Sequence, residues 1–360
     1  MNRNILLNPG PVTLTERVRQ ALLREDLCHR EPEFAELTLD IKTRLASVYP
    51  AAASNYEAIT LTGSGTCAVE AMLSTLIPDT GKALVVSNGV YGERMAAMIK
   101  AQGKPLEVIT SEWFEPMNLA EVEKRLEQDS TITHVIPVHH ETTTGRLNDV
   151  AKLGLICKAK NVALLLDCVS SFGAEEIDFT NWNLEACAST ANKCLHGVPG
   201  ISFVLVKKSV FTCRPSASKT LYLDLYRYQQ EQVSGYSPFT QAVHVAYALQ
   251  EALKEMEEMG GWTARNQRYT HLANLIRQGL AELGMPTFLN EQDYSCVLAS
   301  FKLPSGYSYE QIHDTLKTSG FIIYAGQGGL KKAIFRIANM GDIQLDDVEK
   351  LLNCFRNLLH

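Results

Sequence analysis

Two charged residues, Asp167 and Lys193, stand where an α/β protein can carry out chemistry. The apolar run 162–166 has the composition of a buried parallel strand and ends at Asp167. A carboxylate at the carboxyl end of such a strand points into the crevice where open α/β sheets bind ligands. Lys193 follows in a small polar segment, 189–193, just before a Gly/Pro turn. The pair therefore indicates a site at the edge of a sheet.

An aspartate and a lysine over one crevice suit pyridoxal phosphate as a cofactor. The lysine amine can form a Schiff base with the cofactor aldehyde, and the aspartate can keep the pyridine nitrogen protonated so that the ring takes up electrons. The same two residues are equally compatible with an aspartate that ends a strand and a lysine on the surface. Other segments therefore have to decide between the two interpretations.

A second segment has the composition of a phosphate-binding turn. The predicted strand 58–62 is followed by Gly63, Ser64, Gly65 and Thr66, and a helix is expected over 67–77. Small residues let backbone N–H groups approach an anion, and the helix N-terminus adds a positive dipole. The turn is neither a Walker loop nor GxGxxG. Tight strand–helix turns also use Gly and Ser for structural reasons, so this signal is weak alone.

Two further loops follow predicted strands and carry suitable side chains. Tyr91 lies in a Gly-flanked turn between the strand 83–87 and the helix 93–102, where an aromatic ring can stack on a pyridine face. Thr142 follows the strand 133–138, and its hydroxyl can bond the phenolic oxygen of the ring. Both loops lie at strand carboxyl ends, so we expect them near Asp167.

The order of predicted elements defines the fold class. Strands and helices alternate from about residue 58 to 206, which predicts an α/β fold with a mostly parallel sheet covered on both faces. After about residue 221 the composition changes, and 222–228 is aromatic and loop-like. We predict a large domain over 15–258 and a small C-terminal α+β domain over 259–360, joined by the N-terminal arm 1–14.

Composition excludes several classes of protein. The chain has 360 residues, 46% of them hydrophobic, and a net charge of −6, which disfavours bulk binding to nucleic acid or to anionic membranes. The nine cysteines include no CxxC pair and read as reduced thiols, mostly buried. No signal peptide is visible, and no segment approaches the roughly 18 apolar residues of a membrane span. These features predict a cytoplasmic protein.

Seven segments together resemble a known family. In order they are NPGP (8–11), GSGT (63–66), NGVYGERM (88–95), HHETTTG (139–145), LLLDCVSSFGA (164–174), ANKCLHGVPG (191–200) and FRIANMGD (335–342). They are similar to the class V group of fold-type I pyridoxal-phosphate aminotransferases. The resemblance implies a seven-stranded sheet, Asp167 and Lys193 as catalytic residues, and Ser64, Gly65, Thr66, Tyr91 and Thr142 as further cofactor-binding residues.

Within this family, ETTTG and NKCLHGVPG are most similar to enzymes that transfer the amino group of 2-aminoethylphosphonate to pyruvate. That likeness implies phosphonoacetaldehyde and L-alanine as products, in phosphonate metabolism. The segment LCHREPEF (27–34) departs from the pattern of many such enzymes. An alanine–glyoxylate or serine–pyruvate aminotransferase remains the alternative, although those enzymes carry ESSTG-like and QKAL-like segments. A cysteine desulfurase-like lyase is a more remote alternative.

The resemblance also assigns residues outside the segments that surround the cofactor. Thr240 matches a residue that reaches the cofactor phosphate of the neighbouring subunit, which implies a homodimer with shared active sites. Arg336 matches the arginine that clamps the acid group of the substrate, and its planar fork suits a carboxylate or a phosphonate. Thr13 and the backbone after Pro11 are candidates for further contacts to the substrate, as are His29 and Arg30.

Three other features have structural explanations. His139 and His140 are adjacent in a strand and point to opposite faces, so we expect no shared metal and no metal site. Cys194, beside Lys193, is expected to be a buried packing residue rather than a persulfide-forming one. The acidic run 251–258 is expected to be the solvated face of a helix.

Overall fold

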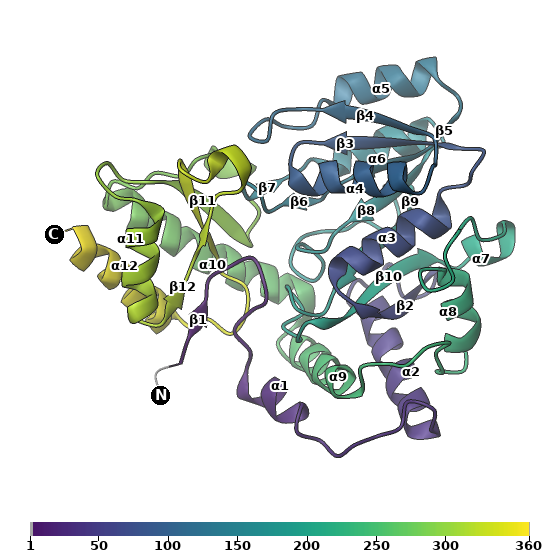
Figure 1. Cartoon of the computed structure of the whole chain (residues 1–360), viewed down its shortest axis with the longest axis horizontal. Coiled ribbons are helices and arrows are strands. Elements are labelled where there is room, and N and C mark those ends of the chain that lie inside the picture. Colours follow the sequence, from purple (N-terminus) through teal and green to yellow (C-terminus); the bar gives the residue numbers. More distant parts are fainter. Residues whose placement is uncertain (1–2, 360) are drawn as a thin grey trace.

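A seven-stranded sheet forms the centre of the larger part of the molecule, as Figure 1 shows for the computed structural model, which describes residues 3–359. Its strand order is β2-β10-β9-β8-β5-β3-β4, and only β10 runs antiparallel to its neighbours. In that order the strands are Tyr56–Gly63, Gly200–Lys207, Leu184–Thr190, Ala163–Asp167, Ile132–Pro137, Lys82–Ser87 and Leu106–Thr110. The predicted α/β class with a mostly parallel seven-stranded sheet is confirmed.

Helices cover both faces of this sheet. On one face lie α3 (Gly65–Leu76), α4 (Val90–Ala101), the short α7 (Val210–Cys213) and α8 (Leu225–Gln232). On the other face lie α2 (Pro32–Ser47), α5 (Leu119–Gln128), α6 (Val150–Ala159) and α9 (Val243–Glu258). Apolar strand residues point to both layers, which is why the parallel strands read as nearly continuous apolar runs.

The C-terminal part is a smaller layer of helices on a three-stranded antiparallel sheet. The sheet contains β11 (Leu298–Lys302), β14 (Ile334–Ala338) and β13 (Tyr324–Ala325). It is accompanied by α10 (Gly261–Glu282), α11 (Tyr309–Thr318), α12 (Leu345–Leu359) and two short 3-10 helices, η1 (Glu291–Asp293) and η2 (Gly328–Leu330).

The N-terminal arm packs on this smaller part. Strand β1 (Ile5–Leu6) pairs in parallel with β12 (Phe321–Ile322), and Ile5 and Leu7 belong to the apolar core of the C-terminal part. Figure 1 shows β1 beside β12, far from the large sheet. The chain then enters α1 (Glu16–Ala21), whose N-cap Thr15 accepts a hydrogen bond from Val18 N at 3.2 Å. The domain bounds at residues 14 and 258 stay a prediction, and residues 1, 2 and 360 lie outside the described part.

Two predicted segments differ from the structure. The segment 222–228 was expected to be a loop, but α8 begins at Leu225, where Asp224 accepts a hydrogen bond from Tyr226 N at 3.1 Å. Leu225 and Tyr228 are fully buried against the face that also holds α3, and this burial stabilises a helix that its aromatic composition does not favour. Strand β9, LEACAST, matched no predicted strand because its small residues carry little β-propensity.

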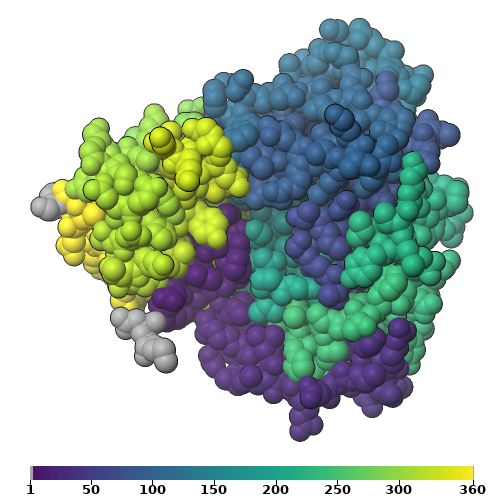
Figure 2. Space-filling view, viewed as in Figure 1, coloured from purple at the N-terminus to yellow at the C-terminus, as the bar shows by residue number. Residues whose placement is uncertain are grey.

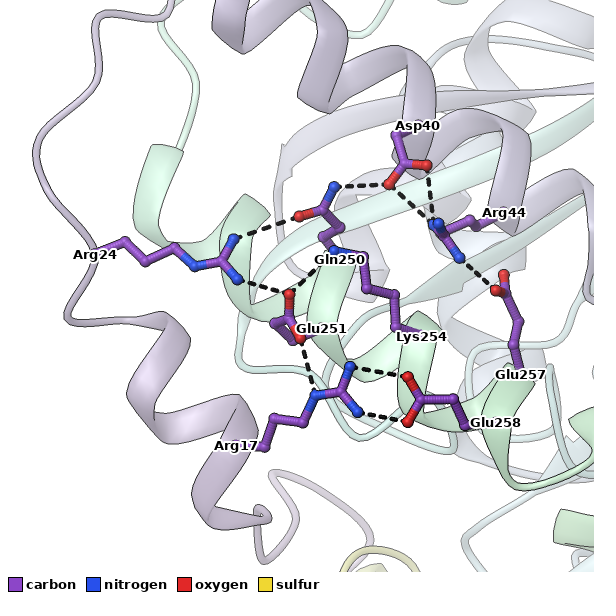
Figure 3. A network of polar contacts seen from close by, with 9 residues as sticks. All are labelled: Arg17, Arg24, Asp40, Arg44, Gln250, Glu251, Lys254, Glu257 and Glu258. Carbon is purple, nitrogen blue, oxygen red and sulfur yellow. Dashed lines mark hydrogen bonds and ion pairs between the residues drawn. The ribbon is translucent and has the colours of Figure 1, made fainter.

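The acidic run at the end of α9 is not a solvated face throughout, which corrects our prediction. Figure 3 shows that Glu251 accepts hydrogen bonds from Arg17 Nε at 2.9 Å and from Arg24 Nη2 at 2.6 Å, and its side chain is 9% exposed. Arg17 also binds Glu258 through both Nη atoms, and Arg44 of α2 contacts Glu257. These ion pairs arise because α1 and the segment after it lie across α9.

Within residues 3–359, no helix is long and apolar enough to cross a membrane. All nine cysteines are free; Cys28 and Cys213 are exposed, and the other seven are buried or half-buried. The predicted cytoplasmic location stays a prediction.

Candidate active site

Asp167 is the last residue of β8 and is buried at the carboxyl edge of the sheet, with 6% of its surface exposed. Its Oδ1 accepts a hydrogen bond from Val169 N at 3.0 Å. Burial raises the pKa of Asp167 to about 6, against the effects of that hydrogen bond and of the cations Arg94 and Lys193. Among the described residues it forms no ion pair within 4.0 Å. A buried carboxylate of this kind fits a ligand that offers a positively charged N–H.

Three of the predicted site residues line one cavity. Asp167, Thr66 and Tyr91 surround it together with Val169 and Arg94. The guanidinium of Arg94 lies over the Tyr91 ring, 4.8 Å from the ring centroid. Val169 and Arg94 were not predicted, although each stands in a segment that resembles the family. The cavity is small, about 30 Å³, but its lining joins an aromatic ring, a branched apolar side chain and a carboxylate, which are residue types that suit a flat nitrogen heterocycle.

Tyr91 lies on a helix, where the sequence predicted a turn. Helix α4 begins at Val90, so Tyr91 is in its first turn and is half-buried. The predicted start at Glu93 was wrong: Glu93 N already donates to Gly89 O at 3.1 Å, and Val90 N donates to the Thr143 hydroxyl, which comes from a distant segment. As a consequence, the ring direction of Tyr91 depends on how the N-terminus of α4 is held.

The turn Gly63–Thr66 leads into α3, which begins at Gly65. Ser64 is the N-cap residue, is exposed, and makes no capping hydrogen bond with its side chain. A Cβ on Gly65 would lie 2.8 Å from Val169 Cγ1, so glycine allows this turn to approach the loop after β8. The first N–H groups of α3 have no side-chain cap, which is the arrangement that binds a phosphate at a helix N-terminus.

Lys193 follows β9 and meets the N-terminal arm. Its Nζ donates a hydrogen bond to Pro9 O, and its pKa is lowered to about 8, chiefly by burial. Asp167 opposes this shift and Arg336 adds to it. In Figure 2 the dark purple arm fills the seam between the yellow-green C-terminal part and the teal large domain. Near neutral pH a share of this amine is unprotonated, as a nucleophile and proton carrier requires.

Arg336 is buried in β14 and bridges the two parts of the molecule. Its Nη1 donates to Thr142 O at 2.7 Å, and its Nε donates to Ala325 O at 2.9 Å. Burial lowers the pKa of Arg336. Tyr91, Glu141 and tyrosines of the C-terminal part oppose this shift. Composition alone would have placed this arginine on the surface. The structure instead brings it to the turn that carries Thr142.

The turn after β6 (His140–Glu141) leads into β7 (Arg146–Leu147) and is buried. The Thr143 hydroxyl donates to Glu141 Oε1 at 2.6 Å and accepts from Val90 N at 3.2 Å. Thr142 itself is buried, with 2% of its surface exposed. Glu141 and Thr143 were not singled out from the sequence as site residues. Their part of the HHETTTG segment was the only signal that pointed to them.

Thr13 and Thr240 do not line the cavity beside Asp167, and the same holds for Ser64, Gly65, Thr142, Lys193 and Arg336. Thr13 is buried, and its hydroxyl accepts a hydrogen bond from Leu6 N at 2.7 Å within the N-terminal arm. Thr240 is exposed on the segment before α9. Neither side chain lines that cavity. Their predicted roles towards substrate and partner subunit stay predictions.

The two adjacent histidines are neutral packing residues. Burial lowers the pKa of His139 to about 3 and that of His140 to about 4. The ring of His139 packs edge-on against Trp182, and His140 Nδ1 lies 3.1 Å from Ser170 O. Between residues 3 and 359 no group of three His, Cys, Asp or Glu side chains could hold a metal. Cys194 is buried, as predicted.

The fold and the residues at the sheet edge define an aminotransferase of fold-type I. A family model described as aminotransferase class-V matches residues 19–351. The 2-aminoethylphosphonate–pyruvate transaminase of Bacillus mycoides (strain KBAB4) is 38% identical, over 98% of this chain and 98% of the relative. The chain therefore belongs to the class-V aminotransferase family, as the sequence segments indicated.

Solved structures have the same fold. The aspartate aminotransferase of subgroup IV from Thermus thermophilus has a TM-score of 0.90 and 27% identity, over 99% of both chains. The alanine–glyoxylate aminotransferase from Nostoc sp. has a TM-score of 0.92 and 24% identity, over 100% of this chain and 96% of that one. At that identity the second likeness extends to the fold alone.

Proposed function

We propose that this chain transfers the amino group of 2-aminoethylphosphonate to pyruvate with pyridoxal phosphate, giving phosphonoacetaldehyde and L-alanine. The main support for the cofactor is the buried Asp167, which has no ion pair within residues 3–359 and shares a cavity with Thr66 and Tyr91. The substrates rest on the relatives named 2-aminoethylphosphonate–pyruvate transaminase, which are similar to this chain over nearly its whole length.

Pyridoxal phosphate, when bound, supplies an aldehyde that carries the amino group between substrates and a ring that takes up electrons. Asp167 would keep the ring nitrogen protonated, and Tyr91 and Val169 would hold the ring. Ser64, Gly65 and Thr66 would hold the phosphate at the N-terminus of α3. Thr142 would bind the phenolic oxygen.

Lys193 would bind the cofactor covalently and, once the substrate amine had displaced it, would act as the proton carrier. Its Nζ would remove the proton from the substrate carbon that bears the amino group and would return it on the cofactor side, as base and then as acid. A pKa lowered to about 8 by burial suits both roles, because neither protonation state is scarce near neutral pH.

Arg336 would bind the acid group of each substrate in turn. The phosphonate occupies this position in the first half-reaction and the pyruvate carboxylate in the second, because a transaminase reuses one acid pocket. A phosphonate carries up to two charges near neutral pH, so one arginine cannot satisfy all three oxygens. Further donors would come from Thr13 and the backbone after Pro11, with His29 and Arg30 as additional candidates.

We also propose a homodimer in which Thr240 reaches the cofactor phosphate of the partner subunit. The exposure of Thr240 in a single chain supports this. Mixing inactive Lys193→Ala chains with chains inactivated by a bulky Thr240 substitution should restore activity, because the mixed dimer holds one intact site. No recovery after demonstrated subunit exchange would contradict shared sites.

A screen of amine donors against pyruvate, read out as alanine formed, tests the activity. With pyruvate as acceptor, we expect 2-aminoethylphosphonate to give a higher kcat/KM than serine. Alanine is compared with glyoxylate as acceptor, because its reaction with pyruvate forms no net product. A preference for alanine or serine with glyoxylate as acceptor would replace the proposal by an alanine–glyoxylate or serine–pyruvate aminotransferase. Turnover of cysteine without any keto acid would indicate a lyase.

A further inference from the structure

Glu141 is a buried carboxyl group for which the proposed reaction has no use. It ends β6 and has no exposed surface. Its Oε1 accepts hydrogen bonds from Thr143 N at 3.1 Å and from Thr143 Oγ1 at 2.6 Å. Its Oε2 has no hydrogen-bond partner among the described residues. Burying a carboxyl group whose hydrogen bonds are only partly satisfied is destabilising.

The carboxyl group is placed against the N-terminus of α4. The hydroxyl that donates to Glu141 also accepts the hydrogen bond of Val90 N, the first residue of that helix. A Cβ on Gly89 would lie 2.2 Å from Glu141 Cδ, so the loop before α4 rests directly on the carboxyl group. Gly89 supplies no side-chain cap of its own. An acidic group at this position stabilises the free N–H groups of the first turn.

The same turn also contacts the C-terminal part. Thr142 O accepts from Arg336 Nη1 at 2.7 Å, and Thr144 O accepts from Ser300 Oγ at 2.6 Å. Gly145 O accepts from Ser295 N at 3.0 Å. The turn is therefore fixed from both sides, and α4 is fixed to the turn through Thr143 and Glu141.

We propose that Glu141 is a positioning residue that orients Tyr91 over the ring of the cofactor by holding the N-terminus of α4. The inference rests on the proposed function, since it assumes that pyridoxal phosphate binds beside Asp167. Tyr91 is the second residue of α4, so a shift of this helix end moves its ring directly. Thr143 transmits the restraint, and Gly89 leaves room for it.

Both a charge and a hydrogen bond act at this position. Burial raises the pKa of Glu141 to about 7, while the hydrogen bonds from Thr143 lower it. Asp167 adds to the rise, and the N–H of Tyr91 opposes it. Glu141→Gln keeps the acceptor for Thr143 and removes the charge, whereas Glu141→Ala removes both. Comparison of the two variants separates these contributions.

The test compares the full-length variants as cofactor-loaded enzymes and after removal of the cofactor. The dissociation constant of pyridoxal phosphate is measured by absorbance titration, and the dichroism of its visible band reports the asymmetry around the ring. We expect Glu141→Ala to weaken binding about tenfold, the scale of one well-oriented aromatic contact, and to reduce the dichroism. Glu185→Gln and Glu185→Ala are matched controls, because the Glu185 side chain is only 13% exposed and is bound to Arg214 and His134 near the start of β9.

A double-mutant cycle makes the inference specific to Tyr91. In a Tyr91→Ala background, Glu141→Ala should cause no further loss of cofactor affinity, because the ring that it orients is gone. Additive losses would overturn the proposal, as would equal losses in the Glu185 variants. If Glu141→Ala fails to fold, Glu141→Gln must show the reduced dichroism, and wild-type dichroism and affinity in that variant would overturn the proposal. Failure of the unsubstituted protein to bind pyridoxal phosphate would instead contradict the proposed function.

Discussion

The side chain of Lys193 runs directly across Gly10 of the N-terminal arm. A Cβ on Gly10 would lie 2.5 Å from Lys193 Cδ and 2.8 Å from Nζ. The same lysine donates a hydrogen bond to Pro9 O. A residue in the first turn of the chain thus determines the space available to a residue in the middle of the large domain. The arm is part of the candidate active site, although most of it packs on the C-terminal part.

Gly10→Ala should therefore impair the catalytic function of the Lys193 amine without unfolding the protein. The φ angle of Gly10 is +93°, so alanine costs roughly 1–2 kcal/mol of backbone strain in addition to the clash with Lys193. We expect a strong loss of kcat with a small change in the melting temperature. Gly103→Ala is the matched control, because Gly103 has φ +66° and nothing within 4 Å of the added methyl. Equal activity in both variants would contradict the role of the contact.

Borohydride reduction should attach pyridoxal phosphate to Lys193 and to no other lysine. Lys42 provides an internal control, because burial also lowers its pKa to about 8. An unprotonated amine alone would label both residues, whereas a cofactor site around Asp167 labels Lys193 only. Peptide mapping of the reduced protein identifies the modified residue. Label on Lys42 or on another lysine would assign the covalent link elsewhere.

The buried amine of Lys193 should lower the stability of the cofactor-free protein below about pH 8. Burial lowers the folded-state pKa to about 8, and the unfolded value is about 10.4. Between these values the unfolded chain binds more protons, so stability rises with pH through this window. Lys193→Met should be more stable than the unsubstituted chain at pH 7, and the difference should shrink as the pH rises from 8 to 10. Denaturant unfolding at several pH values measures this difference in the free energy of unfolding.

The control for that measurement is an exposed lysine. The side chain of Lys124 is 58% exposed, so Lys124→Met should show no such pH-dependent difference. An equal stability of Lys193→Met and the unsubstituted chain across the whole range would mean that the amine carries no burial cost.

Arg336→Lys should weaken the binding of both substrates. The substitution keeps the charge but loses the planar fork, and a bidentate contact to an acid group is worth roughly 2–4 kcal/mol in kcat/KM. Arg146→Lys serves as control, since Arg146 is a buried arginine whose Nη2 donates to Phe114 O at 2.8 Å. We expect kcat/KM to fall for 2-aminoethylphosphonate and for pyruvate only in Arg336→Lys. Unchanged constants for every substrate would place the acid clamp elsewhere.

Elements with a strong local pattern were predictable from the chain alone. The apolar run that ends at Asp167 forms β8, and the start of α11 (Tyr309–Thr318) is marked by residues close in the chain. In that helix Ser308 and Gln311 form a capping box, an interaction between residues three apart. Such contacts are encoded by near neighbours, so the sequence reveals them directly. The seven segments that resemble the family made Lys193, Tyr91 and Arg336 predictable as site residues.

Features that depend on distant partners were missed or mistaken. Strand β9 is built from small residues, and its position between β8 and β10 makes it a strand. Glu251 was predicted to be solvated because the acidic run alone does not show its partners. Arg17 and Arg24, which bind it, come from another part of the chain. Tyr91 was predicted in a turn because the group that holds the start of its helix, Glu141, lies on β6, the third strand after α4.

The sequence by itself determined the α/β class, the large sheet, the family and the residue types of the candidate site, because these follow from local periodicity and from short segments. Only the tertiary structure decided how those residues work together: the passage of Lys193 over Gly10, the burial of Arg336 against Thr142 O, and the restraint of α4 by Glu141. Each of these joins residues far apart in the chain. Whether such residues come into contact depends on how the layers pack, and no pattern of neighbouring residues encodes the distance between them.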